Sequence, residues 1–345
     1  MQARPLIAVV GAGIAGQTAA AVLSGAGALV TVYDKGRGAG GRLATRRDSG
    51  LQWDHGAQYF TARDPALKAL LASLTAKGLV APWRGNIGTL GPAGFVPGSG
   101  AETRFVGTPR MSALVRALGS GATVYNIEIR DIATRGSMLT LTDRHGEHFG
   151  PYDAVVVATP APQAVPLLAL VPPLASRAAG VDTVPCWALM LAFDRPLGLP
   201  FDGAFVDPAL AQGMIGWIAC DSGKPGRPAI AGETWVVHAS PEWSEAHVEA
   251  PPDVVAPLLL AGFAAVTGSS ATPHTTLTHC WRYAMTTRPA GLNHLLDSSR
   301  PIGACGDWCL GARIEGAFLS GNSLGAALVE RLGLAPAHAS SSASQ

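Results

Sequence analysis

Apolar runs alternate with a glycine-rich turn in the first part of the chain. Leu6 to Val10 is continuously apolar, which is typical of a strand buried on both faces. Gly11 to Gly16 predicts a turn, and the alanine-rich run Gln17 to Gly25 predicts a helix that stops at glycine. A second apolar run, Leu29 to Tyr33, ends at Asp34. This strand–helix–strand pattern predicts a parallel sheet with a right-handed crossover.

Further elements follow before residue 160. Apolar spacing predicts two amphipathic helices, Pro65 to Lys77 and Met111 to Leu118. Thr123 to Ile132 and Ser137 to Thr142 alternate apolar and polar residues on either side of a glycine, which predicts a β-hairpin. Ala154 to Val157 is again a continuously apolar strand. Together these patterns indicate a mixed α/β fold.

The middle of the chain has a different character. From about residue 161 to 294 it carries most of the tryptophans and many proline-rich turns. Trp187 to Phe193 and Thr234 to Ala239 have strand patterns, and Val254 to Val266 has a helical one. This region is expected to form a separate lobe built on a mixed sheet.

The C-terminal part returns to the first pattern, with a short strand at Ile302 to Cys305 and a helix at Ser320 to Leu332. We therefore expect an α/β protein of two domains, the first interrupted by the second. The dinucleotide-binding domain is expected to take residues 1–85, 105–160 and 295–334, the substrate domain 86–104 and 161–294, and a disordered tail 335–345.

Composition limits the function class. With 345 residues of which 48 % are hydrophobic, the chain can bury a large core, so global disorder is excluded. A net charge of +1 leaves no broad basic field for nucleic acid. No long apolar run is free of charges, Gly and Pro, so no transmembrane helix or membrane partner is expected.

Cysteine usage points to a reducing compartment. The five cysteines are an odd number without a CxxC pair, so we expect no disulfide framework and a cytoplasmic protein. Cys305 and Cys309 lack the further partners that a zinc site needs, so no metal is expected. The N-terminus superficially resembles a signal peptide, but the glycine turn explains the same residues better.

The first motif is Gly11-Ala12-Gly13-Ile14-Ala15-Gly16. Its first glycine permits the tight turn, the second lets the backbone approach a pyrophosphate, and the third lets the helix pack on the strand. The helix N-terminus then faces the phosphate charge. Asp34 follows 18 residues after Gly16, where its carboxylate can accept the ribose hydroxyls. A plain glycine-rich turn does not predict that aspartate, so a dinucleotide site is favoured.

A second glycine-rich run, Lys35-Gly36-Arg37-Gly38-Ala39-Gly40-Gly41-Arg42, follows directly. It offers more anion contacts than a simple NAD site requires, and the alternative is a solvated basic loop. The run resembles the second glycine signature of the amine-oxidase-like FAD superfamily. That resemblance implies that Lys35, Gly41 and Arg42 lie at the FAD pyrophosphate.

The third motif lies near the C-terminus and includes Gly306-Asp307 and Glu315-Gly316-Ala317. It is similar to the segments that close the flavin site in this superfamily. The resemblance implies that Asp307 meets the ribityl or pyrophosphate region, and that the helix start at Gly316 and Ala317 faces the flavin N1–C2=O edge. A helix N-terminus there would stabilise an anionic reduced flavin. The alternative for Asp307 is a helix cap.

Two weaker segments agree with this superfamily. Ala158-Thr159-Pro160 ends a buried strand and resembles the segment under the flavin. Ile129 to Ile132 resembles the strand whose backbone touches adenine. Any apolar strand could match in this way.

A closer resemblance, to the bacterial renalases, covers nearly the whole chain. The runs that carry it are DHGAQYFTAR at 54–63, FVG at 105–107, ATPAPQ at 158–163, TW at 234–235, HAS at 238–240, WS at 243–244 and CGDWC at 305–309. It implies a p-hydroxybenzoate-hydroxylase-like fold, non-covalent FAD, and oxidation of 2- or 6-dihydro isomers of NAD(P) to NAD(P)+. O2 would reoxidise the flavin and yield hydrogen peroxide.

The substrate site is less defined by sequence. Gln58 and Tyr59 are candidates for contact with flavin or substrate because their run follows the glycine loops closely. From the second lobe the candidates are His238, Trp243, Trp281 and Tyr283. For each aromatic residue the alternative is a place in the core, and for His238 it is a hydrogen-bonded core histidine.

Two other functions stay open. An amine oxidase on the same fold commonly places a lysine near flavin N5, but this chain has only Lys35, Lys68, Lys77 and Lys224, none on an expected strand of the second lobe. The third possibility is a non-enzymatic flavoprotein. Which dihydro isomer is preferred, NAD against NADP, and the oligomeric state stay undecided.

Overall fold

The computed structural model describes residues 4–119 and 121–335, so nearly all of the predicted tail lies outside the described residues. Contacts divide the chain into two compact units, each made of separated segments. Unit 1 comprises the chain up to Gly41, Leu118–Asp182, and the chain from Arg288; unit 2 comprises Arg42–Ala117 and Thr183–Thr287.

This division differs from the domain prediction in both directions. Residues 161–182 and 288–294, which the sequence grouped with the substrate domain, belong to unit 1. Residues 42–85 and 105–117, which the sequence grouped with the dinucleotide fold, belong to unit 2. The reason lies in their contacts, because the strand β4 (Leu51–Trp53) buries Trp53 against Met190, Ala192 and Val236 of the mixed sheet. The prediction grouped residues by their expected contact with the dinucleotide, whereas the two units group residues by contacts within the chain. The predicted domains therefore stay a prediction.

Unit 1 is built on a six-stranded sheet in the order β19-β20-β13-β1-β2-β9. The central pairs are parallel, and the edge strand β19 is antiparallel to β20. The strands are β1 Leu6–Val10, β2 Leu29–Asp34, β9 Ala122–Tyr125, β13 Ala154–Val157, β19 Leu295–Leu296 and β20 Ile302–Ala304. The predicted buried strands 6–10, 29–33, 154–157 and 302–305 are therefore confirmed within a residue at their ends.

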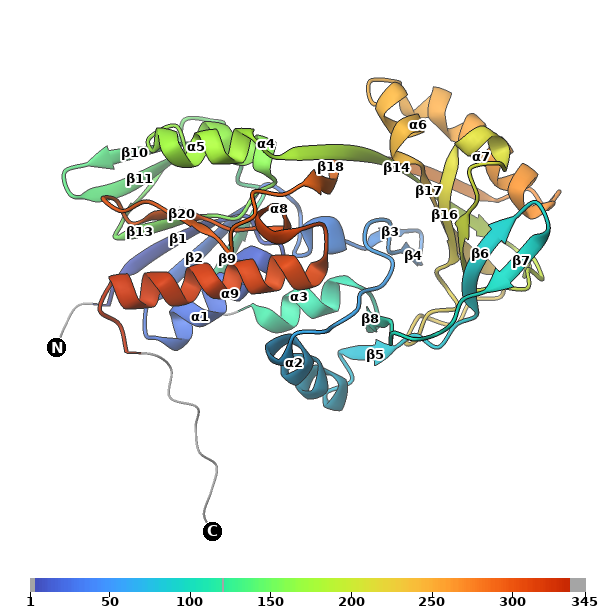
Figure 1. Ribbon diagram of the computed structural model, residues 1–345, viewed down its shortest axis with the longest axis horizontal. Helices are drawn as coiled ribbons and strands as arrows, with labels where there is room; N and C mark the ends of the chain where they lie inside the picture. The colour runs from blue at the N-terminus through green and yellow to red at the C-terminus, as the bar shows by residue number, and fades with distance from the viewer. Residues whose placement is uncertain (1–3, 120, 336–345) are drawn as a thin grey trace, which may run out of the picture. The chain divides into compact units, whose positions relative to one another are not determined.

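Helices cover both faces of this sheet (Figure 1). On one face α1 (Ile14–Gly25) lies against α9 (Ile314–Arg331), and on the other are α4 (Ala161–Leu167) and α5 (Pro172–Ala179). A short helix, α8 (Asp307–Leu310), precedes α9. The predicted last helix thus begins at residue 314, not 320. Its glycines reflect close helix contact rather than a turn: a Cβ on Gly321 would lie 2.2 Å from the Ala15 carbonyl oxygen of α1.

A three-stranded sheet, β10 (Ile129–Arg135), β11 (Met138–Asp143) and β12 (His148–Tyr152), completes unit 1. The expected hairpin is present, but its first strand does not begin at residue 123. Asn126 has a φ of +62°, which interrupts the extended chain. The residues before it join the parallel sheet as β9.

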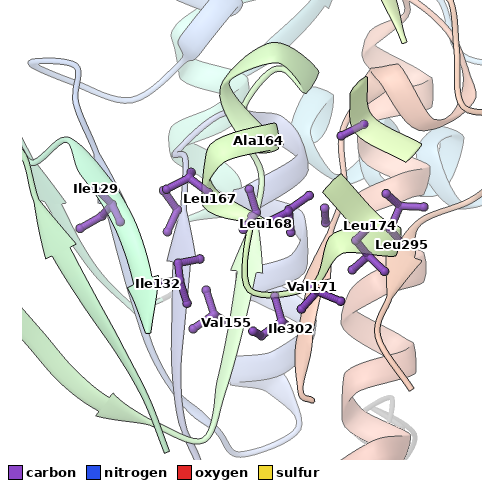
Figure 2. Close-up of a cluster of buried hydrophobic side chains, with 14 of the residues drawn as sticks. Ile129, Ile132, Val155, Ala164, Leu167, Leu168, Val171, Leu174, Leu295 and Ile302 are labelled. Carbon is purple, nitrogen blue, oxygen red and sulfur yellow. The ribbon is translucent and has the colours of Figure 1, made fainter. Parts of the chain in front are cut away.

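The core of unit 1 lies between these layers (Figure 2). Ile132 of β10, Leu168 after α4 and Ile302 of β20 are fully or almost fully buried there. Each such side chain contributes about 1.5–3 kcal/mol by leaving water. This core holds the sheet rigid, so the loops at the strand ends have fixed positions.

Unit 2 is built on a seven-stranded mixed sheet in the order β18-β14-β17-β16-β15-β6-β7. Its strands are β6 Ile87–Gly91, β7 Gly94–Pro97, β14 Asp182–Phe193, β15 Gly203–Val206, β16 Ile215–Cys220, β17 Glu233–Ala239 and β18 Thr275–Arg288. Two small antiparallel pairs join β3 (Arg46–Asp48) to β4, and β5 (Val80–Pro82) to β8 (Phe105–Gly107). The helices are α2 Pro65–Ala76, α3 Ser112–Leu118, α6 Pro241–Ala246 and α7 Pro252–Thr267, with single 3-10 turns at Gly41–Leu43 and Ala211–Gly213.

The two faces of the seven-stranded sheet differ. One face packs under α7 through residues such as Trp235, Val237 and Phe263. Side chains alternate along a strand, so His238 of β17 belongs to the other face. Trp217 of β16 pairs with His238, and Phe205 of β15 pairs with Trp217, so these three form one row across that face.

Candidate functional site

The glycine turn after β1 is built by close backbone contacts in unit 1. Gly11 has a φ of +112°, and a Cβ there would lie 2.7 Å from the Ala158 carbonyl oxygen. A Cβ on Gly16 would lie 2.0 Å from the Gly11 carbonyl oxygen. Only glycine fits at either position, because the turn, the first turn of α1 and the end of β13 touch one another.

The middle glycine faces open space. A Cβ on Gly13 would meet nothing within 4 Å, and the second glycine loop approaches from one side with Gly41 near the Gly13 Cα. Gly13 is the N-cap of α1 and supplies no side-chain cap, so the first N–H groups of the helix, including Ile14 and Ala15, remain available. Open space beside uncapped helix N–H groups forms a cradle of the polarity that a pyrophosphate needs.

Asp34 ends β2 beside this cradle. Its carboxylate accepts hydrogen bonds from the N–H of Ala12 (2.6 Å) and the N–H of Gly36 (2.6 Å), so it ties both glycine loops together. Each oxygen keeps a second lone pair for a ribose hydroxyl. Lys35 is exposed.

The ends of β13 and β20 lie at the same edge. The indole of Trp308 donates to the Thr159 carbonyl oxygen (3.0 Å), which joins α8 to the segment after Ala158. The Gly306 N–H is bound to Ser320 Oγ of α9 (3.1 Å). Asp307 is buried at the start of α8.

The start of α9 carries the other predicted residues. Glu315, Gly316 and Ala317 are all buried in its first turn, and no side chain caps that end. Ile129 is buried in the core of unit 1, so only its backbone is placed to meet a ligand. The structure thus brings the Gly11–Gly16 turn, Asp34 and Ala158 into one edge of the parallel sheet, where dinucleotides bind in this type of fold. These residues fit a flavin dinucleotide.

The remaining predicted residues lie in unit 2, and several of them contact the segment Asp54–Gln58. The His55 carbonyl oxygen lies 3.1 Å from His238 Nε2 and accepts from the Trp281 indole N–H (3.0 Å). A Cβ on Gly56 would lie 2.0 Å from the Arg42 carbonyl oxygen, so this segment passes close to Arg42. The Arg42 guanidinium donates to the Ala284 carbonyl oxygen (3.2 Å).

Gln58 is held on every side. Its Nε2 donates to the carbonyl oxygens of Asp54 and Gly56, and its Oε1 accepts from Lys224 Nζ at 3.1 Å. Lys224 is only 2 % exposed and forms an ion pair with Asp221 at 2.7 Å.

Two more charges complete this buried network, which comprises Asp54, Asp221, Lys224 and Arg227. Arg227 donates to Asp54 Oδ2, and Thr45 Oγ1 (2.6 Å) and the Met111 N–H (3.1 Å) donate to Asp54 Oδ1. All four charged side chains are at most 1 % exposed. Because two carboxylates balance two cations, the network carries no formal net charge.

A small cavity borders the network beside Gln52 and Thr234, with about 10 Å³ open to water. Asp221 Oδ2 and Arg227 Nε line it and have no hydrogen-bond partner among the described residues. That space suffices for about one water molecule, which two such polar atoms can hold.

Tyr59 lies in an aromatic cluster with Trp83 (6.3 Å between ring centroids) and Trp217 (5.7 Å). The Arg104 guanidinium lies over the Tyr59 ring at 5.2 Å, and Lys224 Nζ lies over the Trp83 ring at 5.5 Å. The buried indole N–H groups of Trp83 and Trp217 have no acceptor among the described residues. The cluster therefore combines occupied ring faces with two free donors.

The other two candidates lie apart. Trp243 stacks on His247 at 3.9 Å and packs on the core under α7, which favours a structural role. Tyr283 shares a face of β18 with His279 and Trp281 by strand alternation. Trp281 packs against His279 at 4.3 Å and against His55 at 4.9 Å.

Burial keeps the histidines of this region neutral. Burial, with neighbouring His279 and His238, lowers the pKa of His55 to about 3. Burial also lowers the pKa of His238 to about 4. Within residues 4–119 and 121–335 these side chains form no group that could hold a metal ion.

The sequence did not indicate the network or two of the three rings in the aromatic cluster. Asp54 stood in a recognised run, but its partners Asp221 and Arg227 lie far along the chain. Lys224 was expected in a glycine- and proline-containing loop, outside the strands of the second lobe. Trp83 and Trp217 carried no motif. The pairing of Trp217 with His238 on one sheet face could have indicated the aromatic cluster, but it becomes visible only once the strand register is known.

Comparison with known proteins places the chain in a family. Residues 9–74 match an NAD(P)-binding Rossmann-like domain, and residues 95–327 match flavin-containing amine oxidoreductase. The chain belongs to the flavin-containing amine oxidoreductase family. It is therefore a flavin-dependent oxidoreductase on an α/β fold with a Rossmann-like domain.

The individual proteins that resemble this chain do so over a short stretch or at low sequence identity. A 68-residue stretch is 41 % identical to protoporphyrinogen oxidase 2, chloroplastic/mitochondrial, of Arabidopsis thaliana, covering 20 % of this chain and 13 % of that protein. Among solved structures, one from Exiguobacterium sp. 255-15 assigned as a protoporphyrinogen oxidase aligns with TM-score 0.78 at 14 % identity, over 96 % of this chain and all of that one. Putrescine oxidase bound to putrescine aligns with TM-score 0.68 at 15 % identity, over 95 % and 100 %. At such identities the structures show a shared fold only.

No helix within the described part of the chain combines the length and the apolar character that crossing a membrane would require.

Proposed function

We propose that the protein is an oxidase with non-covalent FAD that takes a hydride from 2- or 6-dihydro isomers of NAD(P) and passes the electrons to O2. The renalase resemblance motivates the substrate, and the family supports the flavin. FAD rather than a smaller flavin is supported by the pyrophosphate cradle at Gly13 and by Asp34 at the ribose position.

The observation that carries the substrate choice is the pair of cations in the aromatic cluster. Arg104 and Lys224 already occupy the faces of Tyr59 and Trp83. An alkylammonium substrate would need those faces for itself and would be repelled by Arg104, whereas the Lys224 charge is balanced by Asp221. A neutral dihydronicotinamide ring is not repelled by the Arg104 charge.

The reaction makes few demands on acid–base groups. The chemistry that a bound flavin would supply is acceptance of the hydride and transfer of two electrons to O2, which would take up two protons to become hydrogen peroxide. The dihydropyridine becomes aromatic as it loses hydride, so its ring nitrogen supplies the electron pair and no enzymic base is needed. The protein has to position the ring, and neutral His55 and His238 beside Trp281 suit that task.

An amine oxidase is the second candidate. One observation supports it: Lys224 is buried in unit 2, and amine oxidases on this fold commonly place a lysine near the flavin. That lysine is held in an ion pair with Asp221, however, whereas a base for amine chemistry needs a free amine. The family and the fold are compatible with both candidates.

The experiment follows flavin absorbance under anaerobic conditions. The yellow protein should first release its flavin on acid precipitation, as non-covalent FAD does. Intact protein is then mixed separately with the 2-, 6- and ordinary 4-dihydro isomers and with putrescine. We expect rapid bleaching by the 2- or 6-isomer, slow bleaching by the 4-isomer, none by the amine, and peroxide on admitting air. Bleaching by the amine as fast as by every isomer would replace this proposal with the amine oxidase.

A further inference from the structure

We infer that Lys224 is a positioning residue: it fixes the orientation of the Gln58 carboxamide and thereby the backbone of Asp54–Gln58. The inference rests on the proposed function only for its kinetic readout. Lys224 lies on the loop between β16 and β17, 166 residues from Gln58, with its Nζ 3.1 Å from Gln58 Oε1.

The hydrogen bonds determine which way the amide points. An ammonium only donates, so it must face Oε1. Nε2 then donates to the carbonyl oxygens of Asp54 and Gly56, which only accept. A flipped amide would set NH2 against the ammonium and its oxygen against two carbonyls, so Lys224 leaves one orientation.

The oriented amide holds one side of a segment whose other side is held by predicted site residues. The His55 carbonyl lies between the two that Gln58 binds, and it is contacted by His238 Nε2 and the Trp281 indole. The Ala57 N–H donates to the Arg42 carbonyl oxygen (2.9 Å). Three successive peptide groups are thus fixed, and a site residue displaced by about 1 Å can cost about a hundredfold in rate.

Burying the Lys224 charge without a partner would destabilise the fold. Removing its charge from water requires compensation, which Asp221 provides at 2.7 Å. Arg227 and Asp54 extend the compensation on the side of Gln58. The network therefore connects the positioning amide to the rigid sheet of unit 2 rather than to solvent.

The test uses the full-length flavoprotein and hydrogen exchange of peptide 53–60. Lys224→Met combined with Asp221→Asn removes one charge of each sign, which protects the fold from an unpaired buried charge. We expect flavin content to persist, exchange of the peptide to rise about tenfold or more, and kcat with the dihydro isomer to fall about ten- to a hundredfold with a smaller change in KM. The Lys224→Arg variant keeps a cationic donor at this position, so its changes in peptide exchange and in kcat should both be smaller than those of the double variant. Lys68→Met, on the exposed side of α2, is the matched control and should change neither.

A double-mutant cycle separates positioning from general support. In a Gln58→Met background the Lys224→Met/Asp221→Asn change should add little further exchange, because its target is already lost. Wild-type exchange and kcat in Lys224→Met/Asp221→Asn, or full additivity with Gln58→Met, would overturn the inference. If the wild-type protein does not oxidise the dihydro isomers, the proposed function fails, and the exchange cycle still tests Lys224.

Discussion

The two units differ in how they build their candidate site residues. In unit 1 the dinucleotide cradle is mostly backbone: Gly11, Gly13 and Gly16 supply space and N–H groups, and Asp34 is its one charged side chain from the first motif. In unit 2 the site is mostly side chain, with Asp54, Lys224 and Arg227 buried around one loop. The pyrophosphate of FAD is a fixed, charged group that backbone N–H groups can bind. Selecting a reactant requires side chains, and buried side chains need partners.

The comparison predicts that charge matters most in unit 2. Asp54→Asn removes the ion pair with Arg227 and leaves two buried cations, Lys224 and Arg227, with Asp221 as their one remaining carboxylate in the network. We expect the free energy of unfolding to fall by about 3–5 kcal/mol in urea denaturation. Glu102→Gln, which breaks the exposed pair with Arg63, is the control and should cost less than about 1 kcal/mol. Equal losses for the two variants would mean that burial does not distinguish these pairs.

In unit 1 shape should matter more than charge. Gly16→Ala puts a methyl group against the Gly11 carbonyl oxygen and must push α1 away, at a cost of about 1–3 kcal/mol in unfolding free energy.

Gly13→Ala is the matched variant, because its methyl group meets no protein atom. Its unfolding free energy without flavin should stay within about 0.5 kcal/mol of wild type, while flavin affinity falls because the methyl occupies the pyrophosphate space. Flavin fluorescence on release measures the affinity. Normal flavin binding by Gly13→Ala would show that the cradle is elsewhere.

A smaller effect concerns pH and unit 2 alone. Folding lowers the pKa of His238 to about 4, below the ordinary value near 6.5, so the unfolded chain binds its proton first. The stability contributed by the neutral form is complete above about pH 6.5 and is lost as the pH falls toward 4, by at most about 1.4 kcal/mol per pH unit. His238→Gln should therefore flatten the dependence of unfolding free energy on pH between 6 and 4.

Val237→Ala on the same strand serves as the control for that measurement. It destabilises the core without removing a titrating group, so it should lower the whole curve and keep its slope. A slope unchanged in His238→Gln would show that His238 takes up its proton equally in both states.

The sequence by itself determined the features that depend on local chemistry. Continuous apolar runs fixed the parallel strands, and Gly11, Gly13, Gly16 and Asp34 predicted the dinucleotide cradle, because their spacing along one strand–helix–strand unit sets their spacing in space. Long-range contacts were not accessible in this way. Asn126 breaks a strand that alternation alone would continue, and α9 begins at Ile314 rather than at the predicted Ser320.

Only the tertiary structure decided the contents of unit 2. Lys224 reads as a solvated loop residue, and becomes a buried ion-pair partner once the β16–β17 loop meets Asp54 and Gln58. Trp217 of β16 and Trp83, which follows β5, both meet the Tyr59 ring, although the three residues lie far apart in sequence. Burial and pairing depend on which segments meet, and a single strand or loop does not contain that information.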